Sequence, residues 1–364
     1  MVKKKRVTIK DISEEVGVSC TIINRALNNK EGVSAETRQK ILETADRLGY
    51  RVNRVAQSMA RNCINIGVLI PDSWLDYYNI IKKGIDEEFE ILRDYNVECK
   101  YYTVNNIHSS KGTIQALKKC IEDGVHGVII CDAFPFGLEK IFDELRENNI
   151  AVVLSCGLHC LNDRVLCSVQ VDAYCSGKMA AEMLGFLTKE NPDVVIFVGN
   201  KDNDEHQLKI KGFIDEAKIK NLNIIGIYET HDDAVIAHQL ANKVIGECDG
   251  VDGIYSATAN TASICDAVIE KNCNAQIVGT DLCEETVNYI KSGVIQCAIY
   301  QDLEMQGRKA MRILYEYLAE HEETDKIVRI TPHLVISSNV DSYYKGAVAK
   351  CTDRIKQENT DIQL

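Results

Sequence analysis

The chain has 364 residues, of which 45% are apolar, and a formal net charge of -12. This length favours two or three folding units with a sizeable core and excludes a fibrous or disordered protein. An evenly acidic protein would repel duplex DNA. Residues 1–62, however, contain thirteen Lys/Arg and seven Asp/Glu, a balance of +6, which leaves -18 for the remainder. The split indicates a basic module for a polyanion joined to an acidic body, with a solvated charged face as the alternative.

Fifteen cysteines are scattered along the chain, without a CxxC pair or a secretory signal. We therefore expect reduced thiols in a cytoplasmic, nucleoid-associated protein, with no metal and no cofactor. Apolar runs such as 127–131 and 194–198 are far shorter than the roughly 20 residues of a membrane span, so no membrane partner is expected.

The first 50 residues predict three short helices. Thr8 can cap a helix that has Asp11 in its first turn and ends before Gly17. Ser19 can cap a second helix, in which Ile23 and Leu27 point inward. Ser34 can cap a third helix that stops at Gly49.

The outer face of the second helix pairs Cys20 with Asn24 and Thr21 with Arg25. Short polar groups and an arginine at the N-terminal half of a helix fit the DNA major groove, where Arg bonds guanine in bidentate fashion. The alternative is an ordinary helical hairpin with a solvated face.

Several segments of this module resemble the headpiece of the LacI/GalR (lactose-repressor) family. They are Val7-Thr8-Ile9-Lys10-Asp11-Ile12, Gly17-Val18-Ser19, Asn24-Arg25-Ala26-Leu27-Asn28, Gly32-Val33-Ser34, Thr37-Arg38 and Leu48-Gly49-Tyr50. The resemblance implies a helix-turn-helix over residues 1–50 that binds an operator. The DNA-binding residues it implies there are Thr8, Ser19, Cys20, Thr21, Asn24, Arg25, Asn28, Val33 and Ser34.

Residues 51–62 resemble the hinge helix of the same family, which forms when two subunits sit on an operator. The resemblance implies DNA contacts from Asn53, Arg54, Ala56, Gln57 and Met59, with Met59 inserted into the minor groove. A simple linker is the alternative. Val52 stands where the family usually has Pro, and Asn24 replaces a common Ser, so the operator preference cannot be borrowed.

From residue 64 onward, short β-branched runs alternate with helical stretches. Strands are expected at 64–71, 97–104, 124–131, 151–155, 194–199, 224–228, 253–256 and 275–280. Strict alternation implies parallel sheets covered on both faces, and the number of strands implies two lobes with a ligand cleft between them.

Residues 63–345 also resemble the periplasmic-binding-protein-like (type I) core of the same family. The stretches that carry this resemblance include 66–71, 124–130, 171–172, 212–213, 278–281 and 301–302. The pattern implies a first lobe of about 63–165 and 300–330, a second lobe of about 166–299 and 331–345, and three crossings between them. Residues 346–364 form a polar tail without a leucine heptad.

The resemblance implies a small-molecule site, and a sugar-like effector is expected from the family. The candidate ligand-binding residues are Trp74, Tyr77, Tyr78, Cys156, Lys209, Thr258, Asp281 and Gln301. Tyr77 or Tyr78 could instead be core residues, and Asp281 could instead cap a helix. Lys209 stands where the family has a sugar-binding Arg, and Cys156-Gly157 stands where many members have Asp-Arg, so a modified sugar, a nucleoside or another metabolite remains open.

The expected function is therefore a ligand-responsive transcriptional regulator that acts as a repressor. The ligand is expected to relieve repression, with corepression by the ligand as the alternative. It would read a pseudo-palindromic operator as a homodimer. A solute-binding protein would need an export signal, and an α/β enzyme would need a GxSxG, GxxxxGK[ST] or HExxH motif; none of these is found. We do not expect an enzyme.

Overall fold

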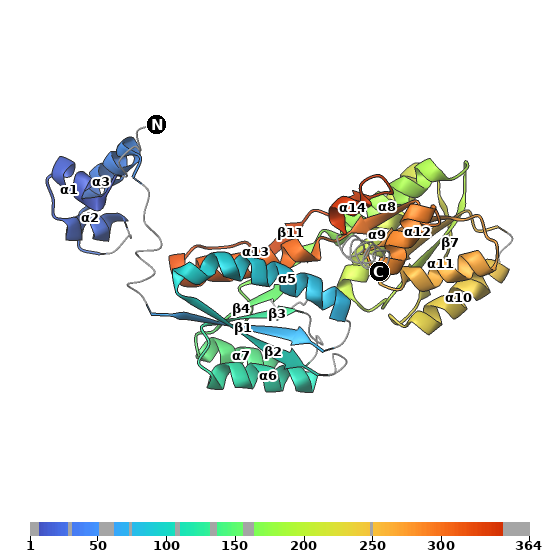
Figure 1. The fold of residues 1–364 in the computed structure, drawn as a ribbon, viewed down its shortest axis with the longest axis horizontal. Coiled ribbons are helices and arrows are strands. Elements are labelled where there is room, and N and C mark those ends of the chain that lie inside the picture. The colour runs from blue at the N-terminus through green and yellow to red at the C-terminus, as the bar shows by residue number, and fades with distance from the viewer. Residues whose placement is uncertain are drawn as a thin grey trace, which may run out of the picture. The chain divides into compact units, whose positions relative to one another are not determined.

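The computed structural model describes residues 7–27, 31–50, 62–72, 75–105, 110–131, 137–155, 164–247 and 250–344 (Figure 1). These residues belong to two compact units, a helical unit and a larger unit that contains the strands. We describe each unit by itself.

The helical unit contains α1 (Ile9–Val16), α2 (Cys20–Leu27) and α3 (Ala35–Leu48). Thr8 and Asp11 form the expected capping box, in which each side chain bonds the other residue's backbone N–H. Ser34 caps α3 by accepting a bond of 3.2 Å from the N–H of Thr37. Gly17 and Gly49 end α1 and α3 in the left-handed region, which only glycine adopts without strain.

A miniature apolar core joins the three helices. Ile12, Ile23 and Ile41 are fully buried in it. On α2 the buried partner of Ile23 is Ala26, while the predicted partner Leu27 is only half-buried. The polar side of α2 is thereby left exposed.

The larger unit contains two sheets, each with six strands among the described residues. The first has the order β11-β5-β4-β3-β1-β2, and neighbouring strands in it run parallel. Its strands are β1 (Ile64–Pro71), β2 (Val97–Val104), β3 (Gly127–Cys131), β4 (Ala151–Ser155), β5 (Cys167–Val171) and β11 (Ile327–Ile330).

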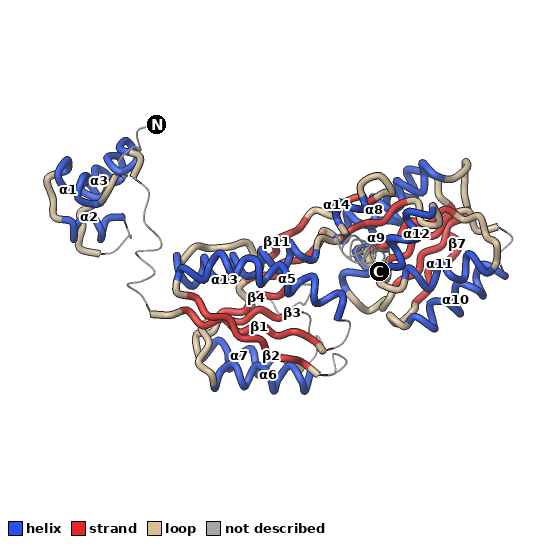
Figure 2. The backbone as a smooth tube through the Cα atoms, viewed as in Figure 1, coloured by secondary structure: helices blue, strands red, loops and turns tan. Residues whose placement is uncertain are grey.

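Helices cover both faces of this first sheet, as Figures 1 and 2 show. On one face lie α6 (Ser110–Glu122) and α7 (Glu139–Glu147); on the other lie α5 (Leu75–Leu92), which leads into a 3-10 turn (Arg93–Tyr95), and α13 (Leu303–Glu320). Strands β1 and β3 are buried along nearly their whole length, which explains their nearly continuous apolar sequences, whereas the edge strands β2 and β11 also have exposed residues.

The second sheet has the order β12-β10-β9-β8-β6-β7. Its strands are β6 (Asp193–Val198), β7 (Asn223–Glu229), β8 (Gly253–Ala257), β9 (Gln276–Thr280), β10 (Cys297–Tyr300) and β12 (His333–Val335). On one face pack α8 (Ala173–Leu187) and α9 (Asp204–Lys220); on the other pack α10 (Ala234–Glu247), α11 (Thr261–Glu270) and α12 (Glu284–Ser292). The short α14 (Val340–Tyr343) follows β12.

The structure corrects the expected lobe boundary. Strand β5 pairs with β4 and β11 in the first sheet, so residues 166–171 belong there, and the first crossing lies after Val171 rather than after 165. Sequence periodicity did not reveal β5, β10, β11 and β12. The last three have only three or four residues, and β5 contains the buried polar residues Ser168 and Gln170. Strand β12 also runs antiparallel to β10, whereas only parallel pairing was expected.

Each lobe is built around one very close helix crossing. In the first lobe, a Cβ on Gly84 of α5 would lie 1.9 Å from the Glu304 carbonyl oxygen, and a Cβ on Gly307 of α13 would lie 2.2 Å from that of Ile81. In the second lobe, a Cβ on Gly177 of α8 would lie 1.9 Å from the carbonyl oxygen of Lys209 on α9. The absence of a side chain at Gly177 therefore lets α9, which contains Lys209, pack directly against the backbone of α8.

Candidate functional sites

The outer face of α2 presents the side chains that the sequence predicts for DNA reading. Ser19, Cys20, Thr21, Asn24 and Arg25 are exposed, and Ser19 lies at the N-terminal cap. Thr8 and Ser34 are also exposed, while Val33 is half-buried against the small core. Ser13 holds the turn between α1 and α2 by donating a bond of 2.6 Å to the Val18 carbonyl oxygen.

Arg25 lies against the backbone at Gly32, where a Cβ would be 3.2 Å from its Nη1. Gly32 also has a φ of +87°, in the left-handed region. The loop before α3 therefore limits where the guanidinium can lie. The predicted contacts Asn28, Asn53, Arg54, Ala56, Gln57 and Met59 lie outside the described residues.

The predicted ligand residues divide between the two lobes. Trp74 and Cys156 lie outside the described residues. Tyr78 is only 2% exposed and meets the half-buried Tyr77 edge-on, with ring centroids 5.2 Å apart. The burial of Tyr78 agrees with the alternative that it is a core residue of the first lobe.

The other four candidates all lie in the second lobe, where its strands end. Asp281 follows β9, Gln301 follows β10, Thr258 follows β8, and Lys209 is on α9, the helix after β6. Carboxyl ends of parallel strands meet at one edge of a sheet, which brings these groups together. We call this region, with Glu205 and Asp232, the carboxyl-edge cluster.

Lys209 is the most unusual member of the cluster, because its side chain is only 2% exposed. Its Nζ lies 2.9 Å from a carboxylate oxygen of Glu205, one turn earlier on α9. Burial by itself lowers the pKa of Lys209, but the negative charges around it, above all that of Glu205, outweigh burial and hold the pKa above its ordinary value. Lys209 is therefore a buried cation already paired with a carboxylate.

Asp281 is a half-buried residue whose carboxylate has one oxygen bonded and one not. Gln301, itself 4% exposed, donates a bond of 2.6 Å from Nε2 to Oδ2 of Asp281. The other oxygen, Oδ1, is buried and has no hydrogen-bond partner among the described residues. Burial raises the pKa of Asp281 to about 6, although Lys209 and Gln301 favour its charged form.

The structure removes the simple alternative for Asp281. The N-cap of α12 is Cys283, not Asp281, and the backbone of Asp281 has a φ of 61°, in the left-handed region. Asp232, after β7, has a φ of 54° as well. Asn, Asp and His are the non-glycine residues that adopt this region most readily, and all ten described non-glycine residues with positive φ are of these types.

Asp232 was missed by the sequence reasoning, as was Glu205. Asp232 accepts a bond of 3.1 Å from the hydroxyl of Thr258, and a Cβ on Gly199 would fall 1.9 Å from its Oδ1. Two signals were available: a carboxylate directly after a strand, and a glutamate four residues before a lysine. Burial together with the charge of Lys209 lowers the pKa of the neighbouring His206, which keeps its ring neutral at pH 7.

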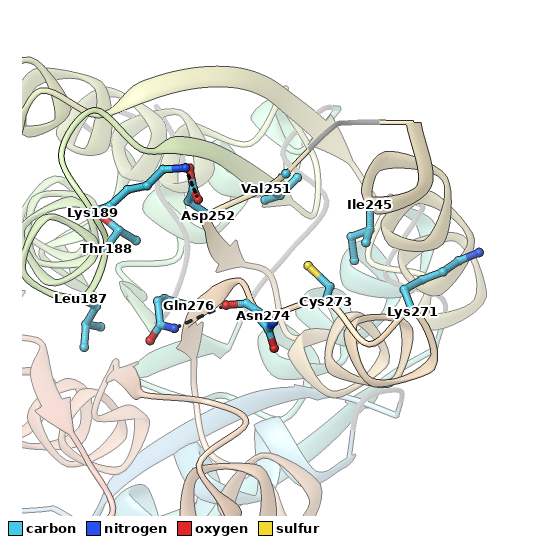
Figure 3. Close-up of a pocket in the computed structure, with 11 residues that line it drawn as sticks. Leu187, Thr188, Lys189, Ile245, Val251, Asp252, Lys271, Cys273, Asn274 and Gln276 are labelled. Carbon is cyan, nitrogen blue, oxygen red and sulfur yellow. Dashed lines mark hydrogen bonds and ion pairs between the residues drawn. The ribbon is translucent and has the colours of Figure 1, made fainter.

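A separate pocket of about 490 Å³ lies at the opposite, amino edge of the second sheet (Figure 3). Lys189 pairs there with Asp252 at 2.9 Å, and Asn274 and Gln276 lie at the start of β9. It contains none of the predicted ligand residues.

Other site types find no support among the described residues. No group of His, Cys, Asp and Glu in them is placed to hold a metal ion. The eleven described cysteines are all free thiols. No helix in the part of the chain that the structure describes is long and apolar enough to cross a membrane.

Comparisons with known proteins match both units. Residues 8–53 match the model of the bacterial regulatory proteins of the lacI family, and residues 66–323 match a periplasmic binding protein domain. Catabolite control protein A of Priestia megaterium is 25% identical over 344 residues, which cover 90% of this chain and 97% of that protein. The HTH-type transcriptional regulator RegA of Clostridium saccharobutylicum is 28% identical over 198 residues, which cover 54% of this chain and 56% of RegA.

Solved structures of binding proteins cover more than three quarters of this chain. The arabinose binding protein AraP of Geobacillus stearothermophilus has a TM-score of 0.69 at 22% identity and covers 78% of this chain and 100% of its own. A periplasmic ribose ABC transporter protein of Conexibacter woesei has a TM-score of 0.71 at 15% identity, covering 80% and 97%. These likenesses establish the type I binding-protein fold.

The headpiece match, the core match and a regulator that aligns over 97% of its length agree with one another. The relatives are transcriptional regulators and not enzymes, as the sequence predicted. The chain therefore belongs to the LacI family of bacterial transcriptional regulators, with a LacI-type DNA-binding domain followed by a periplasmic-binding-protein domain, and acts as a ligand-responsive DNA-binding regulator.

Proposed function

We propose that this regulator is a cytoplasmic, nucleoid-associated homodimer that binds a pseudo-palindromic operator. A sugar-like small molecule sets its affinity for the operator, and binding of this ligand relieves repression. The observation that carries the proposal is the exposed polar face of α2, with Thr21, Asn24 and Arg25 on a helix held by a buried apolar core. A LacI-type helix-turn-helix places such a face in the major groove.

The proposed symmetry of the operator follows from dimerisation. Two identical heads related by a two-fold axis read two half-sites of opposite direction, so a symmetric protein requires a symmetric operator. Residues 51–62 would then act as paired hinge segments at the centre of the site.

The carboxyl-edge cluster supports the effector half of the proposal. It combines a buried cation, a half-buried carboxylate with one buried, unbonded oxygen, and amide and hydroxyl groups at the edge where open α/β sheets bind ligands. A ligand held there and by the first lobe would favour one arrangement of the lobes. That preference would change the spacing of the heads and the operator affinity, which is coupling through a two-state element.

The DNA-binding half can be tested on duplexes of random sequence. Selection of such duplexes on the full-length protein should enrich a two-fold symmetric sequence. On that sequence, Arg25→Ala should lose about 1–3 kcal/mol of binding free energy, with little change on random DNA. Lys40→Ala, at an exposed position of α3, is the charge-matched control. No enrichment over scrambled duplex would refute the proposal, and equal losses on both DNAs would assign Arg25 to phosphate contact.

A further inference from the structure

The charge of the carboxyl-edge cluster is one-sided. Lys209 is its one described cation, against the carboxylates of Glu205, Asp232 and Asp281, while His206 lies beside it with a lowered pKa. The same sign extends along the whole edge. The residues at and after the ends of β6, β7, β9 and β10 include two lysines, Lys201 and Lys209, and eight acids, which are Asp202, Asp204, Glu205, Glu229, Asp232, Asp233, Asp281 and Asp302.

Both lysines of this edge are already engaged. The Nζ of Lys209 pairs with Glu205 at 2.9 Å, and the Nζ of Lys201 donates a bond of 2.9 Å to the carbonyl oxygen of Ile227. Recognition of a phosphate or carboxylate needs Arg, Lys or converging backbone N–H groups whose positive charge is not already neutralised by protein carboxylates. Among the described residues of this edge, an anionic ligand would meet one lysine paired with a carboxylate, one lysine bonded to a carbonyl oxygen, and several carboxylates.

A second, independent feature points to what the cluster accepts. Oδ1 of Asp281 is buried and without a hydrogen-bond partner among the described residues, while Oδ2 takes the amide of Gln301. A buried carboxylate oxygen left unbonded is costly, and a ligand that donates a hydrogen bond to it removes that cost. An ammonium donor adds a full positive charge to the hydrogen bond, so Coulomb attraction to the carboxylate favours it over a neutral hydroxyl donor where water is largely excluded.

We infer that the effector of this site is a polyhydroxylated molecule bearing an amino group, of the amino-sugar class, whose ammonium binds Asp281, and that phosphorylated or acidic sugars are rejected. The inference rests on the proposed function, since it concerns the same site. It narrows the ligand by charge, because the uncompensated carboxylates of the cluster attract an ammonium and repel an anion in a site shielded from water.

The test is a thermal-shift and calorimetric comparison on the full-length protein. The probes are matched sets at millimolar concentration: glucosamine, glucose and glucose 6-phosphate, with the galactose and mannose series beside them. We expect at least one amino sugar to raise the melting temperature and to bind about tenfold or more tightly than its hydroxyl counterpart, because an added charge-assisted bond is of that order. The phosphates should produce no shift.

Two variants separate the carboxylate of Asp281 from general surface charge. Asp281→Asn keeps the shape and should bring the amino and hydroxyl sugars to similar affinities. Asp202→Asn removes a negative charge from an exposed residue of the same edge and should keep the preference. If Asp281→Asn fails to fold, the comparison of sugars on the unsubstituted protein still tests the inference.

The outcomes distinguish this inference from the proposed function. Equal or tighter binding of a neutral or phosphorylated sugar, or no binding of any amino sugar, overturns the inference. If such a neutral or anionic sugar changes operator affinity, the proposed function stands although the inferred ligand class is wrong. If amino sugars bind but no symmetric DNA is selected, the proposed function fails while the ligand class holds.

Discussion

The buried Lys209–Glu205 pair gives the sharpest stability prediction. Lys209 is 2% and Glu205 14% exposed, so Lys209→Met would leave Glu205 without its cation in a site that water hardly reaches, close to Asp281. Breaking a buried pair from one side costs about 3–5 kcal/mol, because one desolvated charge remains. For the larger unit of about 300 residues, that loss lowers the melting temperature by roughly 5–8 °C.

A double-mutant cycle tests the reasoning. Glu205→Gln alone should also destabilise, whereas the double variant should be more stable than the sum of the single losses predicts, by about 1–3 kcal/mol, since neither desolvated charge of the pair remains. Calorimetry or circular dichroism of the full-length variants measures the transition of the larger unit. Losses that add within about 0.5 kcal/mol would refute the claim that the two groups depend on each other.

Three further predictions concern the pH response of Asp281, the Gly177 crossing and the Thr8 cap. The folded pKa of Asp281, about 6, lies above its ordinary 3.8. Protonation of Asp281 therefore stabilises the fold below pH 3.8, and this contribution is lost as the pH rises through 6. Relative to Asp281→Asn, the protein should thus lose up to about 3 kcal/mol between pH 4 and 7, measured by denaturation at each pH; a flat difference would contradict the assigned burial. Gly177→Ala should destabilise the second lobe by about 1–3 kcal/mol, since its Cβ would lie 1.9 Å from a carbonyl oxygen of α9; an unchanged melting temperature would show that the helices separate at no cost. Thr8→Ala should cost the headpiece about 1 kcal/mol through loss of the capping box, seen by helical circular dichroism on heating, whereas Thr21→Ala, on the exposed face of α2, should cost little.

Local rules determined much of this protein from its sequence. Thr8, Ser34, Gly17 and Gly49 mark helix ends through their own backbone and side-chain chemistry, and each was placed correctly. Long β-branched runs such as Ile64–Pro71 were recognised because a strand buried on both faces must be apolar throughout. The short strands β5 and β10 were not, because β5 contains the polar residues Ser168 and Gln170 and β10 has only four residues.

The ligand site shows the same division. Asp281, Gln301, Thr258 and Lys209 were singled out by a family pattern in the sequence, but their relations were not. Only the tertiary structure paired Lys209 with Glu205, added Asp232 to the cluster and left one oxygen of Asp281 unbonded. Burial and charge at a site depend on which strand ends meet at the edge of the sheet, and a linear sequence does not contain that information.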